Sequence, residues 1–312
     1  MQILFVMDPP HIMIPDKDTT FAFLRAAGDR GHQCFTCLPT ELYAAGRSVF
    51  AKARTTQVSD QAPHVVVGTT QVLELAQLDA IFIRKDPPFD TEYLHATQLL
   101  DLVKEQTLVL NDPAGLRAAN EKLFALQFEE WMPETLVTRD RAAIFDFLRA
   151  VGGACVLKPL DGAGGSGVVA LRLEDKNARA LVDIQTHEGT RWAMVQKFEP
   201  GISEGDKRVL LLDGKPLGAI LRVPRPDDIR ANIHVGGSVF ATELTAREQE
   251  LCAAIGPVLV EHGLYFVGLD LIGGKLIEVN VTSPTGIQEL GRHTQSSPEA
   301  KVIEWMESRV RA

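Results

Sequence analysis

An otherwise apolar stretch of the chain, residues 269–281, is interrupted by three oxygen-bearing side chains, Asp270, Glu278 and Asn280. Two short apolar runs around a Gly-Gly pair predict a β-hairpin here. Because residues two apart on a strand share a face, Glu278 and Asn280 point to the same side. Carboxylate and amide oxygens are ligands of Mg²⁺, and substrate phosphates and water usually complete its shell. The pattern favours a magnesium–phosphate site over solvated charges on an exposed sheet face, since such charges seldom lie inside runs this apolar.

The register of this hairpin decides whether the three side chains can serve one metal site. A two-residue turn over Gly273-Gly274 would pair Asp270 with Ile277 and place Asp270 on the face opposite Glu278. Metal binding by all three requires Asp270 to lie opposite Glu278. We therefore expect an odd-length loop over residues 273–275, closed by a left-handed glycine and a bulge.

A second candidate for phosphate binding is the segment Gly162–Gly167, which matches the pattern G-x-G-x-x-G. A dinucleotide-binding fold needs a helix after these glycines, but the continuation at residues 168–173 is typical of a strand. Protein kinases use a strand–glycine–strand loop, yet their H-R-D and D-F-G motifs are absent here, and Lys158 precedes the loop instead of following it. Four glycines in six residues are more than a tight turn needs. We interpret the segment as a flap whose backbone N–H groups bind phosphates.

Charged groups also stand on a proline-containing loop, Arg84–Asp90, directly after a predicted strand at residues 80–83. In open α/β sheets, ligands bind at the carboxyl ends of strands. From the local sequence alone, a ligand-binding loop and a solvated loop are equally good interpretations.

Three further segments have two interpretations each. Residues 193–200 are either a plain edge strand or a strand whose connector binds adenine through its backbone. Arg222 interrupts an apolar strand that returns from an Asp-Gly hairpin, either as a snorkelling surface side chain or as a charge-stabilising group beside the acidic cluster. Residues 224–237 are long, irregular and polar, as in a lid or a disordered segment.

Composition limits the function classes. A chain of 312 residues suggests two or three subdomains, and 45% hydrophobic with 23% charged residues is typical of soluble globular proteins. The net charge of −9 argues against broad binding to nucleic acid or to an anionic membrane. The first apolar run is too short for a signal peptide and no stretch approaches transmembrane length, so we expect a cytoplasmic protein. Cys34 and Cys37, on opposite faces of a predicted strand, are expected to be packing thiols and not metal ligands.

The apolar periodicity predicts an α/β fold. Strands alternate with helices in the first part of the chain, and a second unit begins near Asn120, which can cap a helix that ends before Pro133. Strands are predicted at residues 3–6, 34–38, 65–67, 80–83, 108–110, 193–197, 206–212 and 218–223. Helices are predicted at residues 21–30, 91–104, 141–151, 178–187 and, as the final helix, 245–262.

Together these segments resemble the ATP-grasp superfamily and, within it, the prokaryotic-type glutathione synthetase family. The segments that carry the resemblance are 84–90, 120–123, 133–138, 157–162, 205–209, 266–270 and 278–285. Segments 84–90 and 280–285 distinguish this family from other ATP-grasp ligases. Ala163 stands where the family commonly has Met, and the chain after Gly286 resembles it only weakly.

The resemblance implies an α/β protein of ATP-grasp architecture. An N-terminal open α/β domain, the pre-ATP-grasp domain, would cover residues 1–119. A central ATP-lid subdomain would cover residues 120–199, and a C-terminal α+β subdomain with the metal and peptide site would cover residues 200–312. The family also suggests a homo-oligomer, a tetramer or a dimer.

The implied reaction is ATP-dependent joining of γ-glutamylcysteine to glycine through an acyl phosphate, with two Mg²⁺ ions that Mn²⁺ can replace. The products would be glutathione, ADP and phosphate. Matched positions assign ATP binding to Lys122, Lys158, Gly162, Gly164, Gly165, Gln196, Lys197, Phe198 and Asp206. They assign metal binding to Asp270, Glu278 and Asn280. They assign the peptide to Arg84, Asp86, Arg208, Arg222, Asn280, Ser283 and Thr285.

The resemblance also implies catalytic and protective roles. Arg222, with Arg208, would stabilise the charge that develops during acyl transfer, and the lid over residues 224–237 would exclude water from the acyl phosphate. Its expected lid residues are Asn232, Gly236 and Gly237.

Two rival functions remain. The first is a ligase of the same superfamily that joins other amino acids, which the loop 84–90 argues against. The second is a non-catalytic nucleotide-binding regulator, which the intact lysines and metal ligands argue against.

Overall fold

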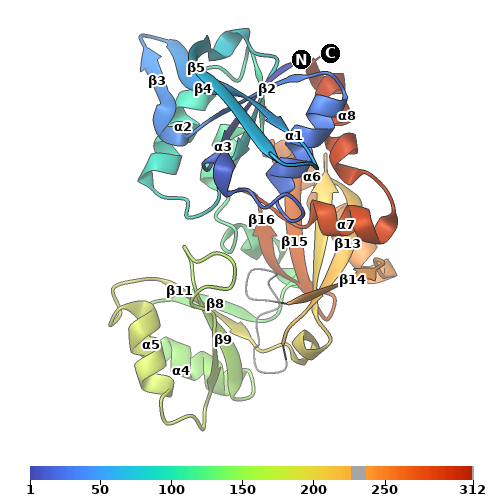
Figure 1. The fold of residues 1–312 in the computed structure, drawn as a ribbon. Coiled ribbons are helices and arrows are strands. Elements are labelled where there is room, and N and C mark those ends of the chain that lie inside the picture. Colours follow the sequence, from blue (N-terminus) through green and yellow to red (C-terminus); the bar gives the residue numbers. More distant parts are fainter. Residues whose placement is uncertain (226–236, 311–312) are drawn as a thin grey trace.

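The computed structural model describes residues 1–225 and 237–310 of the chain. A seven-stranded sheet lies at one end of the molecule, with strand order β3-β4-β2-β1-β6-β7 and β5 beside β4 (Figure 1). Its parallel centre consists of β1 (Gln2–Met7), β2 (Gln33–Cys37), β6 (Ala80–Arg84) and β7 (Leu108–Leu110). Its antiparallel extension consists of β3 (Leu42–Ala45), β4 (Ser48–Val58) and β5 (Val65–Glu74).

The parallel strands are apolar on both faces because helices cover both faces. Ile3 and Phe5 of β1 belong to one hydrophobic cluster, and Leu4 and Val6 to another. Helices α1 (Thr19–Asp29) and α8 (Pro298–Val310) contribute to the first cluster, and α2 (Thr91–Asp101) and α3 (Pro113–Ala118) to the second. This double cover is what an open α/β domain requires.

The four cysteines are buried and free, as predicted. Cys34 and Cys37 of β2 pack into different clusters, so they lie on opposite faces of the strand. Burial raises the pKa of the Cys34 thiol to about 12. These thiols are therefore part of the packing and not a redox or metal pair.

The sequence prediction was incomplete in the antiparallel extension. It missed β3 and β4 and expected only residues 65–67 of β5. Polar residues such as Lys52 and Arg54 interrupt β4, and its buried residues alternate with partly exposed ones. Its pairing with β2, β3 and β5 stabilises this strand more than its own composition does.

A four-stranded antiparallel sheet, β10-β9-β11-β8, forms the central part of the chain at the opposite end of the molecule (Figure 1). Its strands are β8 (Thr135–Thr138), β9 (Ala154–Pro159), β10 (Val169–Arg172) and β11 (Ala193–Lys197). Helices α4 (Arg141–Ala150) and α5 (Ala178–Thr186) pack on it and form a hydrophobic cluster separate from the others.

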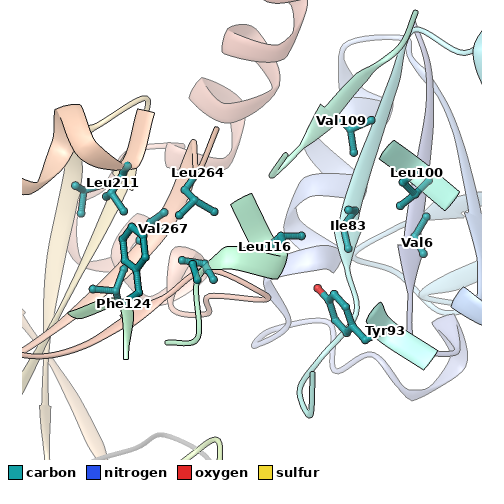
Figure 2. Packing of buried hydrophobic residues seen from close by; sticks show 14 of the residues in the cluster. Val6, Ile83, Tyr93, Leu100, Val109, Leu116, Phe124, Leu211, Leu264 and Val267 are labelled. Atoms are coloured by element: carbon teal, nitrogen blue, oxygen red, sulfur yellow. The ribbon is translucent and has the colours of Figure 1, made fainter. Parts of the chain in front are cut away.

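A third sheet, β14-β13-β12-β15-β16, lies between the other two (Figure 1). Its strands are β12 (Asp206–Leu212), β13 (Lys215–Val223), β14 (Ser238–Thr242), β15 (Phe266–Ile272) and β16 (Lys275–Asn280). Helices α6 (Ala246–Glu261) and α7 (Ile287–Thr294) accompany it. Figure 2 shows Leu116 between side chains of the first sheet, such as Ile83, and of the third, such as Val267, so one core joins these two sheets.

Several details differ from the prediction. The turn after Asn120 is a 3₁₀ helix, η4 (Phe124–Trp131), with a kink at Phe128, although Asn120 does accept bonds from the Lys122 and Leu123 backbones. Helix α6 is not the last, because α7 and α8 follow it. The predicted lid residues Asn232 and Gly236 lie outside the described residues, and Gly237 directly precedes β14. None of the described helices is long and apolar enough to cross a bilayer.

Candidate active site

The hairpin β15–β16 brings Asp270 opposite Glu278, as the metal hypothesis requires. The expected three-residue loop is wrong. Ile272 pairs with Lys275, so the turn contains only Gly273 and Gly274, whose φ angles of 57° and 75° suit a tight left-handed hairpin turn. A bulge between the turn and Asp270 shifts the register, because Leu271 pairs with Leu276 while Asp270 pairs with Glu278. The additional residue is Ile277, and it restores the common face.

Strand pairing extends this face across the sheet. Asp270 pairs with Arg208 on β12, and Asp206 on β12 pairs with Arg222 on β13. Asp206 and Arg208 are two apart and share a face. Alternation along β12 thus places acidic and basic side chains next to each other on one sheet.

These four side chains form a buried ion network. Arg208 donates from Nε and Nη2 to both oxygens of Asp270, at 2.5 and 2.8 Å. Arg222 Nη2 lies 2.5 Å from Asp206 Oδ2 and 2.9 Å from Asp270 Oδ1. All four are at most 8% exposed. A buried charge requires a partner, so each member orients the next.

The network shifts the pKa values of its two carboxylates, Asp206 and Asp270, in opposite directions. Burial by itself raises the pKa of Asp270, but Arg208 and Arg222 outweigh burial and hold that pKa well below the usual range. Burial raises the pKa of Asp206 to about 6, opposed by Arg222 and assisted by the charge of Asp270. The pKa of Arg222 is raised: burial lowers it, and Asp206 and Asp270 more than compensate. Asp270 is therefore the permanent anion of the network.

Two buried lysines stand beside the hairpin. Lys122 Nζ donates to the Gly162 carbonyl at 2.6 Å and to Glu278 Oε1 at 2.9 Å, so it joins the flap to the hairpin. Lys158 Nζ donates to Gln196 Oε1 at 2.7 Å. Burial lowers the pKa of Lys158 to about 8, an effect that Lys122 increases and Glu278 opposes. These cations suit a polyanionic ligand.

The glycine-rich segment connects β9 and β10, which pair antiparallel, so the predicted strand–loop–strand arrangement is confirmed. Gly164 and Gly165 have φ angles of 61° and 80°, which most other residues adopt only with strain. A Cβ on Gly162 would lie 2.7 Å from the Pro159 ring. The loop conformation thus accounts for its glycines, and their backbone borders the cleft described next.

A cleft of about 830 Å³ lies between the central sheet and the third sheet. Every residue that the sequence assigned to ATP lines it: Lys122, Lys158, Gly162, Gly164, Gly165, Gln196, Lys197, Phe198 and Asp206. Asp270 and Glu278 line it as well. Gln196 accepts from Lys158 and donates to Thr135 Oγ1, whereas the Lys197 ammonium pairs with Glu134 at the surface.

A second cavity of about 1030 Å³ adjoins the cleft and shares Glu278 and Gly164 with it. Its wall contains most of the residues assigned to the peptide: Asp86, Arg208, Arg222, Asn280, Ser283 and Thr285. Arg208 Nη1 also donates to the Thr285 carbonyl at 3.2 Å. We call this cavity the reaction cavity.

Arg84 is separated from this set. It is buried at the end of β6 and lines a third cavity, with Asp86, Ser283 and Thr285 common to both cavities. Its partners are Thr20 Oγ1 and the Pro284 carbonyl.

Asp270, Glu278 and Asn280 offer the oxygen atoms that a hard cation such as Mg²⁺ prefers, and they lie where the cleft meets the reaction cavity. Glu278 borders both the cleft and the reaction cavity, Asp270 borders the cleft, and Asn280 borders the reaction cavity. Asn280 Nδ2 donates to Asp270 Oδ2 at 3.2 Å, so the three side chains are contiguous. The described residues contain no cluster of three His, Cys, Asp or Glu that could bind a metal without other donors. A metal here therefore needs the Asn280 amide and ligand oxygens.

Two supporting residues were not identified from sequence. Glu121 accepts from the backbone of Val281 and from the backbone and hydroxyl of Thr282, at 2.8 to 3.3 Å. Asn111 donates to the Phe266 and Val281 carbonyls at 2.9 Å. Both fix the segment after β16. Their only sequence signal was a polar residue inside an apolar or helical context, which is not specific.

Comparison with known proteins gives consistent matches. Residues 1–117 match the prokaryotic glutathione synthetase N-terminal domain, and residues 121–295 match the prokaryotic glutathione synthetase ATP-grasp domain. The glutathione synthetase of Gloeobacter violaceus is 43% identical over 313 residues, covering 98% of this chain and 96% of that protein. That of Thermosynechococcus vestitus is 41% identical, covering 98% and 99%. The D-cycloserine synthetase DcsG structure is 15% identical with a TM-score of 0.66, covering 98% and 100%, a likeness of fold alone.

Proposed function

This chain belongs to the prokaryotic glutathione synthetase family, and from that premise we propose how its cleft and reaction cavity carry out the reaction. It is an ATP-dependent ligase with the ATP-grasp fold, and it makes glutathione from γ-glutamylcysteine and glycine. ATP occupies the cleft, with its phosphates at Lys122 and Lys158, and γ-glutamylcysteine occupies the reaction cavity.

One observation supports this assignment most strongly. Residues from three separate strands, β9, β11 and β12, and from loops outside them, assigned to ATP on sequence grounds, line one cleft. Most of those assigned to the peptide line the adjoining cavity. The two spaces share Glu278. The γ-phosphate and the cysteinyl carboxylate would therefore meet at the hairpin.

The first step transfers the γ-phosphate to the cysteinyl carboxylate. Both reactants are anionic, so their approach requires fixed positive charge, which Lys122 and Lys158 supply from the side of the cleft. Arg208 and Arg222 supply it from the reaction cavity. Magnesium, held by Asp270, Glu278 and Asn280, would add charge neutralisation and orientation of the phosphates.

The second step joins glycine to the activated carboxyl group. Phosphate is a good leaving group, so the amine of glycine attacks the acyl phosphate without an enzyme nucleophile. Arg222 would stabilise the tetrahedral oxyanion. Its Nη2 is bound by Asp206 and Asp270, and no described residue accepts from its buried Nε, so part of the guanidinium remains for the substrate.

Further properties belong to the same proposal. We propose two Mg²⁺ ions, which Mn²⁺ can replace, a homo-oligomeric enzyme, a tetramer or a dimer, and a cytoplasmic location. We also propose domain boundaries at residues 1–119, 120–199 and 200–312.

The proposed function is tested by ADP release in the presence of ATP, Mg²⁺, γ-glutamylcysteine and a panel of amines. Glycine should give rapid ADP release and an equal amount of glutathione, and bulkier amino acids should react much more slowly. A strong preference for another amine would instead favour a ligase of the same superfamily with a different acceptor.

A further inference from the structure

Three polar side chains form a hydrogen-bonded chain on the face of the central sheet that borders the cleft. Strand β11 lies between β8 and β9, and Gln196 on β11 pairs with Thr135 on one side and with Val156 on the other. Lys158 lies two residues from Val156 on β9, so it shares this face. Its neighbour Leu157 belongs to the hydrophobic cluster under α4 and α5, on the opposite face. Strand pairing thus places Thr135, Gln196 and Lys158 in a row that begins at the edge strand β8.

The direction of each hydrogen bond in this row follows from its first member. Thr135 Oγ1 donates its proton to the Pro133 carbonyl at 2.7 Å. Because a hydroxyl has a single proton, Thr135 can then only accept from Gln196, whose Nε2 lies 3.0 Å away. The Gln196 amide is therefore turned with its oxygen towards Lys158, whose Nζ donates to Oε1 at 2.7 Å. The Thr135 hydroxyl thus determines which end of the amide faces the lysine.

Lys158 depends on this amide oxygen because both side chains are buried. Lys158 is 8% exposed and Gln196 is 2% exposed, and among the described residues Gln196 Oε1 is the hydrogen-bond acceptor of the ammonium. Burial lowers the pKa of Lys158 to about 8, since its positive charge is poorly solvated there. A reversed amide would direct N–H groups at the ammonium and repel it. A lysine ammonium has three N–H donors, so the bond to Gln196 leaves the others for phosphate oxygens.

Thr135 lies behind these two residues. The described wall of the cleft includes Lys158 and Gln196 but not Thr135, so Thr135 can affect a ligand in the cleft only through them. On the basis of the proposed function, we propose that Thr135 is a positioning residue for ATP: its hydroxyl orients the Gln196 amide, whose oxygen holds the Lys158 ammonium in place for the phosphates. The alternative is a purely structural hydroxyl that closes the turn at Pro133, which would affect stability and not nucleotide binding.

The test is the variant Thr135→Val, which preserves the shape of the side chain and leaves Gln196 Nε2 without its acceptor. The loss of a buried hydrogen bond corresponds to about 10-fold in affinity, so Kd for a non-hydrolysable ATP analogue with Mg²⁺, measured by calorimetry, should rise by that factor. KM for ATP should rise similarly, and KM for γ-glutamylcysteine and for glycine should stay within about twofold. Thr135→Ser retains the hydroxyl and should restore Kd to within about twofold of wild type.

The matched control is Thr138→Val on the same strand. Thr138 is half-buried like Thr135, and its Oγ1 accepts from the Asp140 backbone N–H at 3.1 Å, away from Gln196. This variant should leave Kd within about twofold of wild type. Thermal unfolding of each variant separates a loss of the fold from a loss of nucleotide binding. Thr135→Ala, which removes the same hydroxyl with a smaller side chain, takes the place of Thr135→Val if the latter does not fold.

A double-mutant cycle tests the route through Gln196. Gln196→Met removes the amide, so adding Thr135→Val to it should change Kd by less than about twofold. The inference is overturned by an unchanged Kd in Thr135→Val, by a failure of Thr135→Ser to restore binding, or by an equal effect of Thr135→Val in both backgrounds. The nucleotide titration does not require ligation. A wild-type enzyme that forms no glutathione would therefore overturn the proposed function, whereas the Kd values would still decide the role of Thr135.

Discussion

Replacing Glu278 by glutamine is expected to impair ligation severely and to leave the fold intact. Glu278 is the one predicted metal ligand that borders both the cleft and the reaction cavity. A glutamine oxygen can still accept the hydrogen bond from Lys122 Nζ, so the local structure should persist. Without the Glu278 charge, Mg²⁺ should bind more weakly, and one of the fixed charges around the transition state is missing. We expect kcat/KM to fall by about 100-fold or more.

The measurement pairs steady-state kinetics with thermal unfolding of the metal-free protein. The melting temperature should shift little, because the glutamine oxygen keeps the hydrogen bond from Lys122 Nζ, and Nζ also donates to the Gly162 carbonyl. Glu304→Gln, on the surface of α8 and paired with Arg30, is the matched control and should leave both quantities unchanged. Near-normal turnover in Glu278→Gln, or its unfolding, would show that Glu278 has a structural role or is simply solvated.

Replacing Asp270 by asparagine is expected to cost both activity and stability. Asp270 is the shared counterion of Arg208 and Arg222, which are 5% and 3% exposed. Removing one partner from a buried ion pair typically costs about 3–5 kcal/mol, because the remaining charge is left uncompensated. Urea unfolding should show this loss at pH 7. Asp213→Asn, which removes a surface pair with Arg309, is the control and should cost less than about 1 kcal/mol.

The same variant gives a pH dependence with a defined sign. The folded protein holds the pKa of Asp270 below that of an unfolded aspartate, about 3.9, since its two arginines outweigh the effect of burial. The carboxylate therefore stabilises the fold fully above about pH 4, and this stabilisation is lost as the pH falls further. The difference in free energy of unfolding between wild type and Asp270→Asn should therefore be smaller at pH 3 than at pH 7. If this difference were the same at both pH values, the charge of the Asp270 carboxylate would not be the source of the stabilisation.

Where chemistry and periodicity coincide, local patterns in the sequence predicted how the candidate site residues lie relative to one another. Because Glu278 and Asn280 are two residues apart on a strand, the sequence predicted that they share a face. The strand predicted after Gly167 excluded a dinucleotide-binding fold. The pairing of Asp270 with Glu278 is confirmed, but a bulge at Ile277 produces it, not a longer turn. A bulge depends on packing of the neighbouring strand, so residue types alone do not locate it.

Long-range packing explains what the sequence did not predict. The strand β4 was missed because its pairing partners, not its composition, stabilise it. Glu121 was missed because the groups that it binds, on Val281 and Thr282, lie about 160 residues later in the chain.

The central claim is that the cysteinyl carboxylate is activated as an acyl phosphate before the amine arrives, and hydroxylamine trapping tests it most directly. Hydroxylamine is a small, strong nucleophile that can enter where glycine should lie. With ATP, Mg²⁺ and γ-glutamylcysteine, but without glycine, the enzyme should yield a hydroxamate of the dipeptide and ADP in equal amounts. Formation of ADP without hydroxamate, even at high hydroxylamine, would contradict the claim and indicate a plain ATPase.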